Sequence, residues 1–481
     1  MNIAVLLPEI TLFCGGLLIL MLDIFLSKKN ANFFYINHLL ALVICGISIA
    51  LSFKNFVLND FFFNKLYHNS PLISLVKSFI ILLLTFVLVM SLRFVCLKPK
   101  FSAEFLALIL FATTGGIIMI ASNDFLVFYL GLELQALSFY LLSAINTKSP
   151  KSSEAGLKYF ILGSLASGLL LYGISMIYGF MGTTNFSSIA ELVELQKNDV
   201  SSGFLLGIIL VLIAMFFKLS NAPFHMWAPD VYEGSPTIVA TIFATVGKFS
   251  AVLALSLLFY NFSWLILSKI MVSVGLLSII VGSFGAIFQK NFKRLLAFSS
   301  ISHVGFVIIG FAGLGKNVLV AVIFYIFVYS LISLGTFGFL NLMVSKNDID
   351  NDAEDNKIFN ISSLSGLSKT NPVMALCLSL LMFSTAGIPP LAGFFSKFYI
   401  LSSTLASGFF FFALVAIIFS VISAFYYLRI VKIIYFDKPN NAMVVDESLA
   451  IKSIIIFSAI LNLIMIIFIE NIFSLLNSFI F

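Results

Sequence analysis

Three lysines lie deep within apolar stretches of this sequence, where an ionisable side chain is costly. They are Lys218, Lys248 and Lys397, and none has an acidic residue within one helical turn. An ammonium at membrane depth usually faces a carboxylate or a hydrated cavity. Glu133 is the matching acid, because it lies within FLVFYLGLELQALSFYLL with no basic residue near it, so its partner must come from another helix. Such a pair can exchange ionised and neutral forms, which predicts a proton or ion path; a protonated Glu133 bonded to backbone is the alternative.

Three further lysines have simpler interpretations. Lys158 follows Glu154 by four residues, so the two side chains share one helix face and can form an ordinary surface ion pair. Lys158 also lies a turn inside its apolar run, where water screens charge less, and is therefore a second candidate for the path. Lys77 and Lys269 lie near the ends of apolar runs, and we expect their ammonium groups to snorkel to the lipid headgroups.

The apolar run that contains Lys218 should break at Pro223. This proline cannot donate a backbone N–H and clashes with the carbonyl of Leu219, so the helix should open just after Lys218. His225 follows the break and could relay protons, because an unperturbed histidine titrates near pH 6.5. A hydrogen-bonded interfacial histidine is the alternative.

A second break is expected in STAGIPPLAGFFSK. Pro389 and Pro390 together free the carbonyls of Thr385 and Ala386. Unsatisfied backbone at membrane depth is tolerated only beside protein or water. Broken helices at corresponding positions of two halves point to a transport site.

His303 lies in a Ser-rich helical run and is open to the same two interpretations as His225.

Composition sets the class of protein. The chain is 61% hydrophobic and only 10% charged, and apolar runs of helix-spanning length recur along it. This predicts a polytopic α-helical membrane protein. The net charge of +6 does not indicate nucleic-acid binding, because most Lys and Arg lie in short loops. The four cysteines are scattered singly, so any redox cofactor should lie on another polypeptide; they are Cys14, Cys45, Cys96 and Cys377.

The runs predict about fourteen transmembrane helices, with boundaries uncertain by about two to four residues. The two breaks fall five spans apart, as an inverted repeat of two five-helix units requires. The expected segments are an N-terminal three-helix segment, two repeats and a C-terminal helix, at 1–102, 103–258, 259–435 and 436–481. Loops on the side of Lys28 hold most of the loop Lys and Arg, which places both termini away from the cytoplasm.

Three motifs resemble a known family: KLSNAPFHMWAPDVYEGSPT at 218–237, QKNFKRLLAFSSISHVGF at 289–306 and AGIPPLAGFFSKFYI at 386–400. They closely resemble the antiporter-like membrane subunits of bacterial respiratory complex I, and the likeness covers essentially the whole chain. The resemblance implies a fourteen-helix subunit with no redox centre of its own. It also implies a charged axis in which Glu133 pairs with Lys218, Lys158 modulates that pair, Lys248 is the central connection, Lys397 is the outward lysine, and His225 lies in a hydrated link.

We therefore expect proton translocation coupled to quinone reduction in partner subunits. NADH, FMN, iron–sulfur clusters and quinone would be handled by those partners, which include neighbouring antiporter-like and small membrane subunits. The resemblance implies a multi-pass protein of the bacterial inner membrane with periplasmic termini. The alternatives are a subunit of an Mrp-type cation/proton antiporter, and a structural scaffold in which the buried lysines are incidental.

Overall fold

A computed structural model of the chain describes residues 3–26, 33–97, 102–195, 201–261, 265–313, 316–345, 358–439 and 443–479. The chain divides into two compact units. Unit 1 is Met1–Leu219, Gly234–Phe262 and Phe479–Phe481, and unit 2 is Ser220–Glu233 and Ser263–Ser478. Much of the loop sequence behind the predicted topology, at 27–32, 98–101 and 346–357, lies outside the described residues, so the orientation of the termini stays a prediction.

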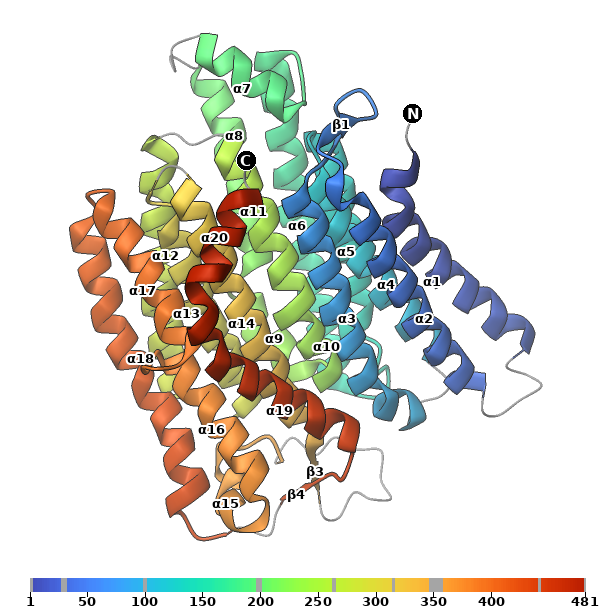
Figure 1. The fold of residues 1–481 in the computed structure, drawn as a ribbon, viewed down its shortest axis with the longest axis vertical. Helices are drawn as coiled ribbons and strands as arrows, with labels where there is room; N and C mark the ends of the chain where they lie inside the picture. Colours follow the sequence, from blue (N-terminus) through green and yellow to red (C-terminus); the bar gives the residue numbers. More distant parts are fainter. Residues whose placement is uncertain are drawn as a thin grey trace. The chain divides into compact units, whose positions relative to one another are not determined.

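Unit 1 contains the N-terminal helices and α8, which ends at Leu219 just before the first break, and α1, α2 and α3 run side by side in Figure 1. Its helices are η1 (Ile3–Leu6), α1 (Leu7–Leu26), α2 (Phe33–Lys54), η2 (Asn55–Val57), α3 (Pro71–Leu97), α4 (Ser102–Ala121), α5 (Phe125–Ser143), α6 (Pro150–Met181), α7 (Phe186–Leu195), α8 (Ser202–Leu219), α10 (Thr237–Ile242), η4 (Phe243–Gly247) and α11 (Lys248–Asn261). A short antiparallel hairpin pairs β1 (Asp60–Phe62) with β2 (Tyr67–Asn69).

Unit 2 contains the second break. Its helices are α9 (Trp227–Gly234, all but the last residue), α12 (Leu265–Ile287), α13 (Phe292–Gly310), α14 (Lys316–Leu342), η5 (Ile361–Leu364), α15 (Leu367–Thr370), α16 (Pro372–Ala386), α17 (Ala392–Ala406), α18 (Phe410–Phe436), α19 (Leu449–Ile464), η6 (Met465–Phe468) and α20 (Ile469–Phe479, all but the last residue). A second antiparallel pair joins β3 (Met343–Ser345) to β4 (Met443–Val445).

The predicted α-helical membrane fold is confirmed. Among the described residues, 13 helices are long and apolar enough to cross a membrane. The broken pair α16 and α17 accounts for the remaining predicted span, since each half has only 15 residues. The two short β pairs were not predicted. Three-residue strands carry almost no sequence signal of their own, because they form only where tertiary contacts support them.

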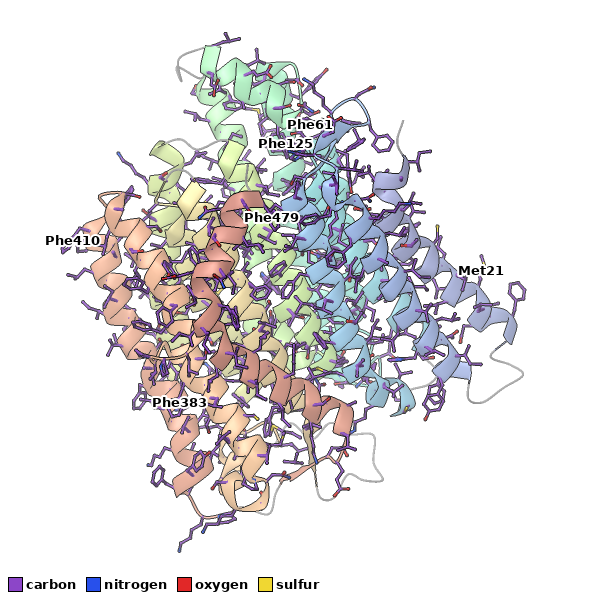
Figure 2. All side chains as sticks on the ribbon, in the orientation of Figure 1. Met21, Phe61, Phe125, Phe383, Phe410 and Phe479 are labelled. Carbon is purple, nitrogen blue, oxygen red and sulfur yellow. The ribbon has the colours of Figure 1, made fainter. Side chains whose placement is uncertain are left out.

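Apolar side chains cover the outer surface of the helices as well as the core. Met21 and Phe410 are 59% and 66% exposed, whereas Phe125 is fully buried (Figure 2). For a protein in lipid, exposed aliphatic and aromatic side chains are the expected outer surface, because hydrocarbon tails are as apolar as leucine.

Glycines bring helix backbones close together in both units. A Cβ added at Gly115 of α4 would lie 2.6 Å from the carbonyl oxygen of Gly131 in α5. In unit 2, a Cβ at Gly275 of α12 would lie 2.8 Å from the carbonyl oxygen of Gly305 in α13. Small residues at crossings allow close helix packing in membranes. The crossing in unit 1 fixes α5, the helix that carries Glu133.

Candidate functional site

Lys218 lies in the last turn of α8, which ends at Leu219, one residue beyond this lysine. Its ammonium nitrogen is buried and makes no hydrogen bond among the described residues. The nitrogen lies over the ring of Phe139 on α5, 5.2 Å from the ring centroid. An ammonium has three N–H donors. A buried ammonium without partners must therefore either bind water or lose its proton.

Glu133 lies on α5 in the same unit as Lys218. It is half-buried and accepts a hydrogen bond from the hydroxyl of Ser167 on α6. This serine comes from another helix, and the pairing of Glu133 with Lys218 stays a prediction.

Lys248 is the first residue of α11 and follows the π-helical turn η4. Its side chain is buried, and its nitrogen donates to the carbonyl oxygen of Leu219 at 3.4 Å. This carbonyl ends α8 and is the one that Pro223 deprives of its helical N–H partner. A π-helical turn often marks a functional position in a helix, and here it directly precedes Lys248.

The second break lies between α16 and α17 in unit 2. Gly387 ends α16 with φ of 86°, a left-handed conformation that favours glycine. Lys397 on α17 is buried, and its nitrogen donates to the carbonyls of Thr385 and Ala386, each at 3.0 Å, and to Ser420 at 3.3 Å. The two carbonyls are those that the Pro-Pro pair frees. A cation at a helix C-terminus also interacts favourably with the helix dipole.

The two remaining candidates have different surroundings. Lys158 forms an ion pair of 2.7 Å with Glu154, and the two side chains are 41% and 62% exposed. This is the i, i+4 ion pair that the sequence predicts, and the role of Lys158 as a modulator stays a prediction. His225 lies in unit 2 between α8 and α9, and its Nδ1 is buried without a hydrogen-bond partner among the described residues.

A histidine–tyrosine network in unit 2 was not predicted from the sequence. His303 on α13 bonds the hydroxyls of Tyr325 on α14, at 2.8 Å, and Tyr427 on α18, at 3.0 Å. Tyr427 also bonds Ser299 and interacts with Thr385, whose carbonyl accepts from Lys397. The SSISH run in the sequence indicated His303 as a candidate. It could not indicate the partner tyrosines, because they lie on other helices.

Lys77 corrects one expectation. It does not snorkel: it is 1% exposed and forms an ion pair of 2.9 Å with Glu9. The expectation considered only the distance of Lys77 from its span end and could not see a partner 68 residues earlier. Lys269, by contrast, is exposed. Among the described residues, no group of three or more His, Cys, Asp or Glu side chains could hold a metal.

Comparisons with known proteins identify relatives along the whole chain. A family model described as NADH:quinone oxidoreductase/Mrp antiporter, transmembrane, matches residues 122–423. NADH-quinone oxidoreductase subunit N of Pelagibacter ubique is 41% identical over 97% of this chain and 97% of its own. Its counterpart in Rhodospirillum rubrum is 38% identical over 94% and 92%.

Solved structures show the same fold. A chain of respiratory complex I from Thermus thermophilus aligns with a TM-score of 0.81 at 24% identity, over 97% of this chain and 99% of that one. A chain of the Mrp complex from Dietzia sp. aligns with a TM-score of 0.78 at 19% identity, over 99% and 97%. On these matches, the chain belongs to the NADH-quinone oxidoreductase subunit N family, within the wider group of NADH:quinone oxidoreductase and Mrp antiporter membrane subunits.

Proposed function

We propose that this chain is a proton-translocating membrane-arm subunit of a respiratory NADH:quinone oxidoreductase, and that its buried Glu and Lys side chains carry the protons. The observation that carries the proposal is the buried Lys218 ammonium, which has no hydrogen-bond partner among the described residues. Ionisable groups inside a membrane protein mark ion or proton pathways by default.

The proposed step is electrostatic. Desolvation disfavours the charged form of Lys218, and the Glu133 carboxylate favours it. When the reaction in partner subunits weakens this attraction, Lys218 releases its proton; when the attraction returns, it takes up another. A change of one pKa unit is worth about 1.4 kcal/mol, and a proton crossing 100 mV needs about 2.3 kcal/mol. A change of a few pKa units at the lysine is therefore sufficient to move a proton across such a potential.

Lys248 and Lys397 extend the path within their own units. Each donates to backbone carbonyl oxygen at a helix break. A carbonyl oxygen is uncharged and can accept a hydrogen bond from a charged ammonium or from a neutral amine. Each site can therefore accommodate its lysine in both protonation states. We assign Lys248 the central connection and Lys397 the outward position, with His225 in a hydrated link and Lys158 as modulator of the first pair.

The remaining parts of the proposal concern the complex. NADH, FMN, iron–sulfur clusters and quinone lie with partner subunits, among them neighbouring antiporter-like and small membrane subunits, and this chain contributes no redox chemistry. Segments 103–258 and 259–435 form the inverted repeat, flanked by 1–102 and 436–481. Both termini face the periplasm.

The test is Lys218→Ala in the intact complex. We expect NADH oxidation and assembly to persist while proton pumping per electron falls. Lys269→Ala is the matched control, because Lys269 is an exposed lysine near a helix end. Unchanged pumping in assembled Lys218→Ala complex would refute the assignment and favour the scaffold role.

An Mrp-type antiporter is the second candidate, favoured by the fold shared with the Mrp chain. Gentle solubilisation of native membranes that contain a tagged chain separates the two. Flavin and iron–sulfur subunits with NADH:quinone activity should co-purify. Purification with small membrane partners only, and transport that depends on sodium or potassium, would instead establish the antiporter.

A further inference from the structure

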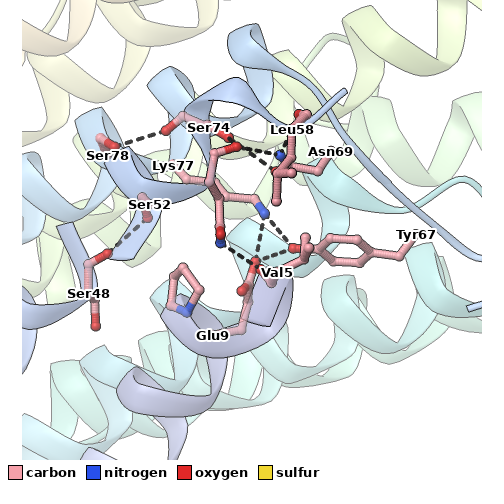
Figure 3. Close-up of polar contacts among 12 residues, drawn as sticks. Val5, Glu9, Ser48, Ser52, Leu58, Tyr67, Asn69, Ser74, Lys77 and Ser78 are labelled. Carbon is pink, nitrogen blue, oxygen red and sulfur yellow. Dashed lines mark hydrogen bonds and ion pairs between the residues drawn. The ribbon is translucent and has the colours of Figure 1, made fainter. Parts of the chain in front are cut away.

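Three titratable side chains of unit 1 meet beside hairpin β1–β2. Glu9 of α1, Tyr67 of β2 and Lys77 of α3 are 3%, 4% and 1% exposed. Lys77 pairs with Glu9 at 2.9 Å and bonds the Tyr67 hydroxyl, which in turn donates to Glu9 at 2.5 Å. Figure 3 shows the triangle of contacts. The triad is net neutral when the acid and the base are both ionised.

The tyrosine ties this charge pair to the hairpin β1–β2. Burial, reinforced by the Glu9 carboxylate, raises the pKa of Tyr67 well above its ordinary value of 10. The hydroxyl therefore stays protonated and remains a donor to Glu9. Hydrogen bonds to ionised partners are roughly twice as strong as neutral ones.

The hairpin needs this external support. Each strand has three residues, too few for a stable isolated pair. Its turn places Phe63, Asn64 and Lys65 at φ of 54°, 55° and 65°, three successive left-handed residues without a glycine. Such conformations persist only where the surroundings over-determine them.

The other side of the hairpin forms hydrogen bonds with the turn between α4 and α5 and with the turn between α6 and α7. The side-chain amides of Asn123 and Asn185 both donate to the carbonyl of Lys65 at 2.8 Å. The backbone N–H of Asn123 donates to the carbonyl of Leu66 at 2.9 Å. The next residue, Asp124, caps α5 by accepting from the N–H of Leu126 at 2.8 Å.

We propose that Glu9, Tyr67 and Lys77 form a latch that holds hairpin β1–β2 against α1 and α3, and that the hairpin thereby fixes the α4–α5 turn. Glu133 lies on α5 nine residues beyond the Asp124 cap, roughly 14 Å along the helix at about 1.5 Å per residue. The latch is thus a remote positioning site for Glu133. Its importance for pumping rests on the proposed function; the anchoring of the hairpin does not.

The test measures backbone amide exchange by mass spectrometry in the purified complex that contains Tyr67→Phe. Phenylalanine keeps the ring but removes the hydroxyl. We expect exchange in segments 58–69 and 122–126 to accelerate by about tenfold, the effect of losing a hydrogen bond to a charged group. Asn37→Ala is the matched control, because it removes the Asn37–Asp23 bond elsewhere in α1–α2 and should leave both segments unchanged.

A second variant keeps the proposal testable where Tyr67→Phe assembles poorly. The double change Glu9→Gln/Lys77→Met replaces the ion pair by uncharged groups of similar length and leaves no buried unpaired charge. It should also accelerate exchange in both segments. Unchanged exchange in either assembled variant overturns the latch. Reduced pumping with unchanged exchange identifies the triad as a proton site instead.

The same preparations separate this proposal from the proposed function. Amide exchange reads the hairpin directly, whether or not the complex pumps protons. Faster exchange with wild-type pumping leaves the latch in place and removes only its importance for Glu133. A pumping defect in Lys218→Ala with wild-type exchange at 58–69 supports the proposed function alone.

Discussion

Unit 1 contains two groups in which a glutamate, a hydroxyl and a lysine come together, and they differ in how tightly the lysine is held. In one, Lys77 contacts both Glu9 and Tyr67, and the ion pair measures 2.9 Å. In the other, Glu133 accepts from Ser167, while the buried Lys218 nitrogen makes no hydrogen bond among the described residues. Lys77 therefore has two direct polar partners, whereas Lys218 has none among the described residues.

This difference separates a lysine whose charge stabilises the fold from a lysine whose proton can be exchanged. Removing a proton from Lys77 would leave Glu9 as an unpaired buried carboxylate, which is strongly destabilising. Lys218 has no direct bond to lose, so its charge depends on a longer-range attraction that small movements can change. We infer that the tight group fixes the fold and the loose group responds to it. Lys248 and Lys397 lie between these extremes, because neutral carbonyls hold them.

The largest expected difference lies between Glu9→Gln and Glu133→Gln. Glu9→Gln leaves the Lys77 ammonium buried beside a neutral amide, at a cost of about 3–5 kcal/mol. The amount of assembled complex on native gels should therefore fall sharply. Glu133→Gln should assemble normally but lose most proton pumping, because Lys218 loses its counter-charge. Equal assembly of the two variants would remove the distinction between the two groups.

A somewhat smaller effect is expected at Lys397, where the two functions of a lysine can be separated. Lys397→Met removes two hydrogen bonds at the end of α16 and one to Ser420 on α18, each worth about 1.5–3 kcal/mol for a charged donor. Both thermal stability and pumping should fall. Lys397→Arg retains a cation for the carbonyls but cannot release a proton. We expect it to recover stability without pumping, and recovery of both would contradict proton transfer at this position.

The local consequences of each break could be predicted from the sequence, whereas the partners of the freed groups could not. Proline geometry alone identifies the carbonyls of Leu219, Thr385 and Ala386. The donors, Lys248 and Lys397, reach these carbonyls through the packing of separate helices. No local spacing encodes that packing.

The same limit explains the error at Lys77 and the absence of the hairpin from the sequence-based expectations. Position relative to a span end suggested snorkelling, but Glu9 lies on another helix. Strands of three residues with a left-handed turn have no periodic pattern to detect. Long apolar helices, in contrast, were predictable because the bilayer fixes their length and composition.

A modest effect is expected for Ser167→Ala. The hydroxyl of Ser167 donates to Glu133, and a hydrogen bond to a charged group contributes about 1.5–3 kcal/mol when buried, less at this half-buried position. Removing it should leave the Glu133 carboxylate less firmly held and reduce pumping severalfold with assembly unchanged. Ser164→Ala is the control, because its hydroxyl donates to the backbone of Phe160 on an exposed face of the same helix. Equal pumping in both variants would exclude Ser167 from the pair.

The smallest expected effect is a dependence of the hairpin on pH. His68 stacks on Phe61 with ring centroids 4.6 Å apart, next to the latch. Burial, followed by the charge of Lys77, lowers the pKa of His68 below its ordinary value of 6.5, while Asp60 opposes the shift. The folded hairpin therefore prefers neutral His68. Above pH 6.5 this histidine is neutral in both folded and open hairpin, and it imposes no penalty.

As the pH falls below 6.5, the open hairpin binds the proton more readily, so the docked form loses stability. Amide exchange at 58–69, corrected for its intrinsic pH dependence, should accelerate between pH 7.5 and 5.5. His68→Gln should remove this acceleration and leave Lys77 paired with Glu9. A persistent acceleration in His68→Gln would exclude His68 as the cause of the pH dependence.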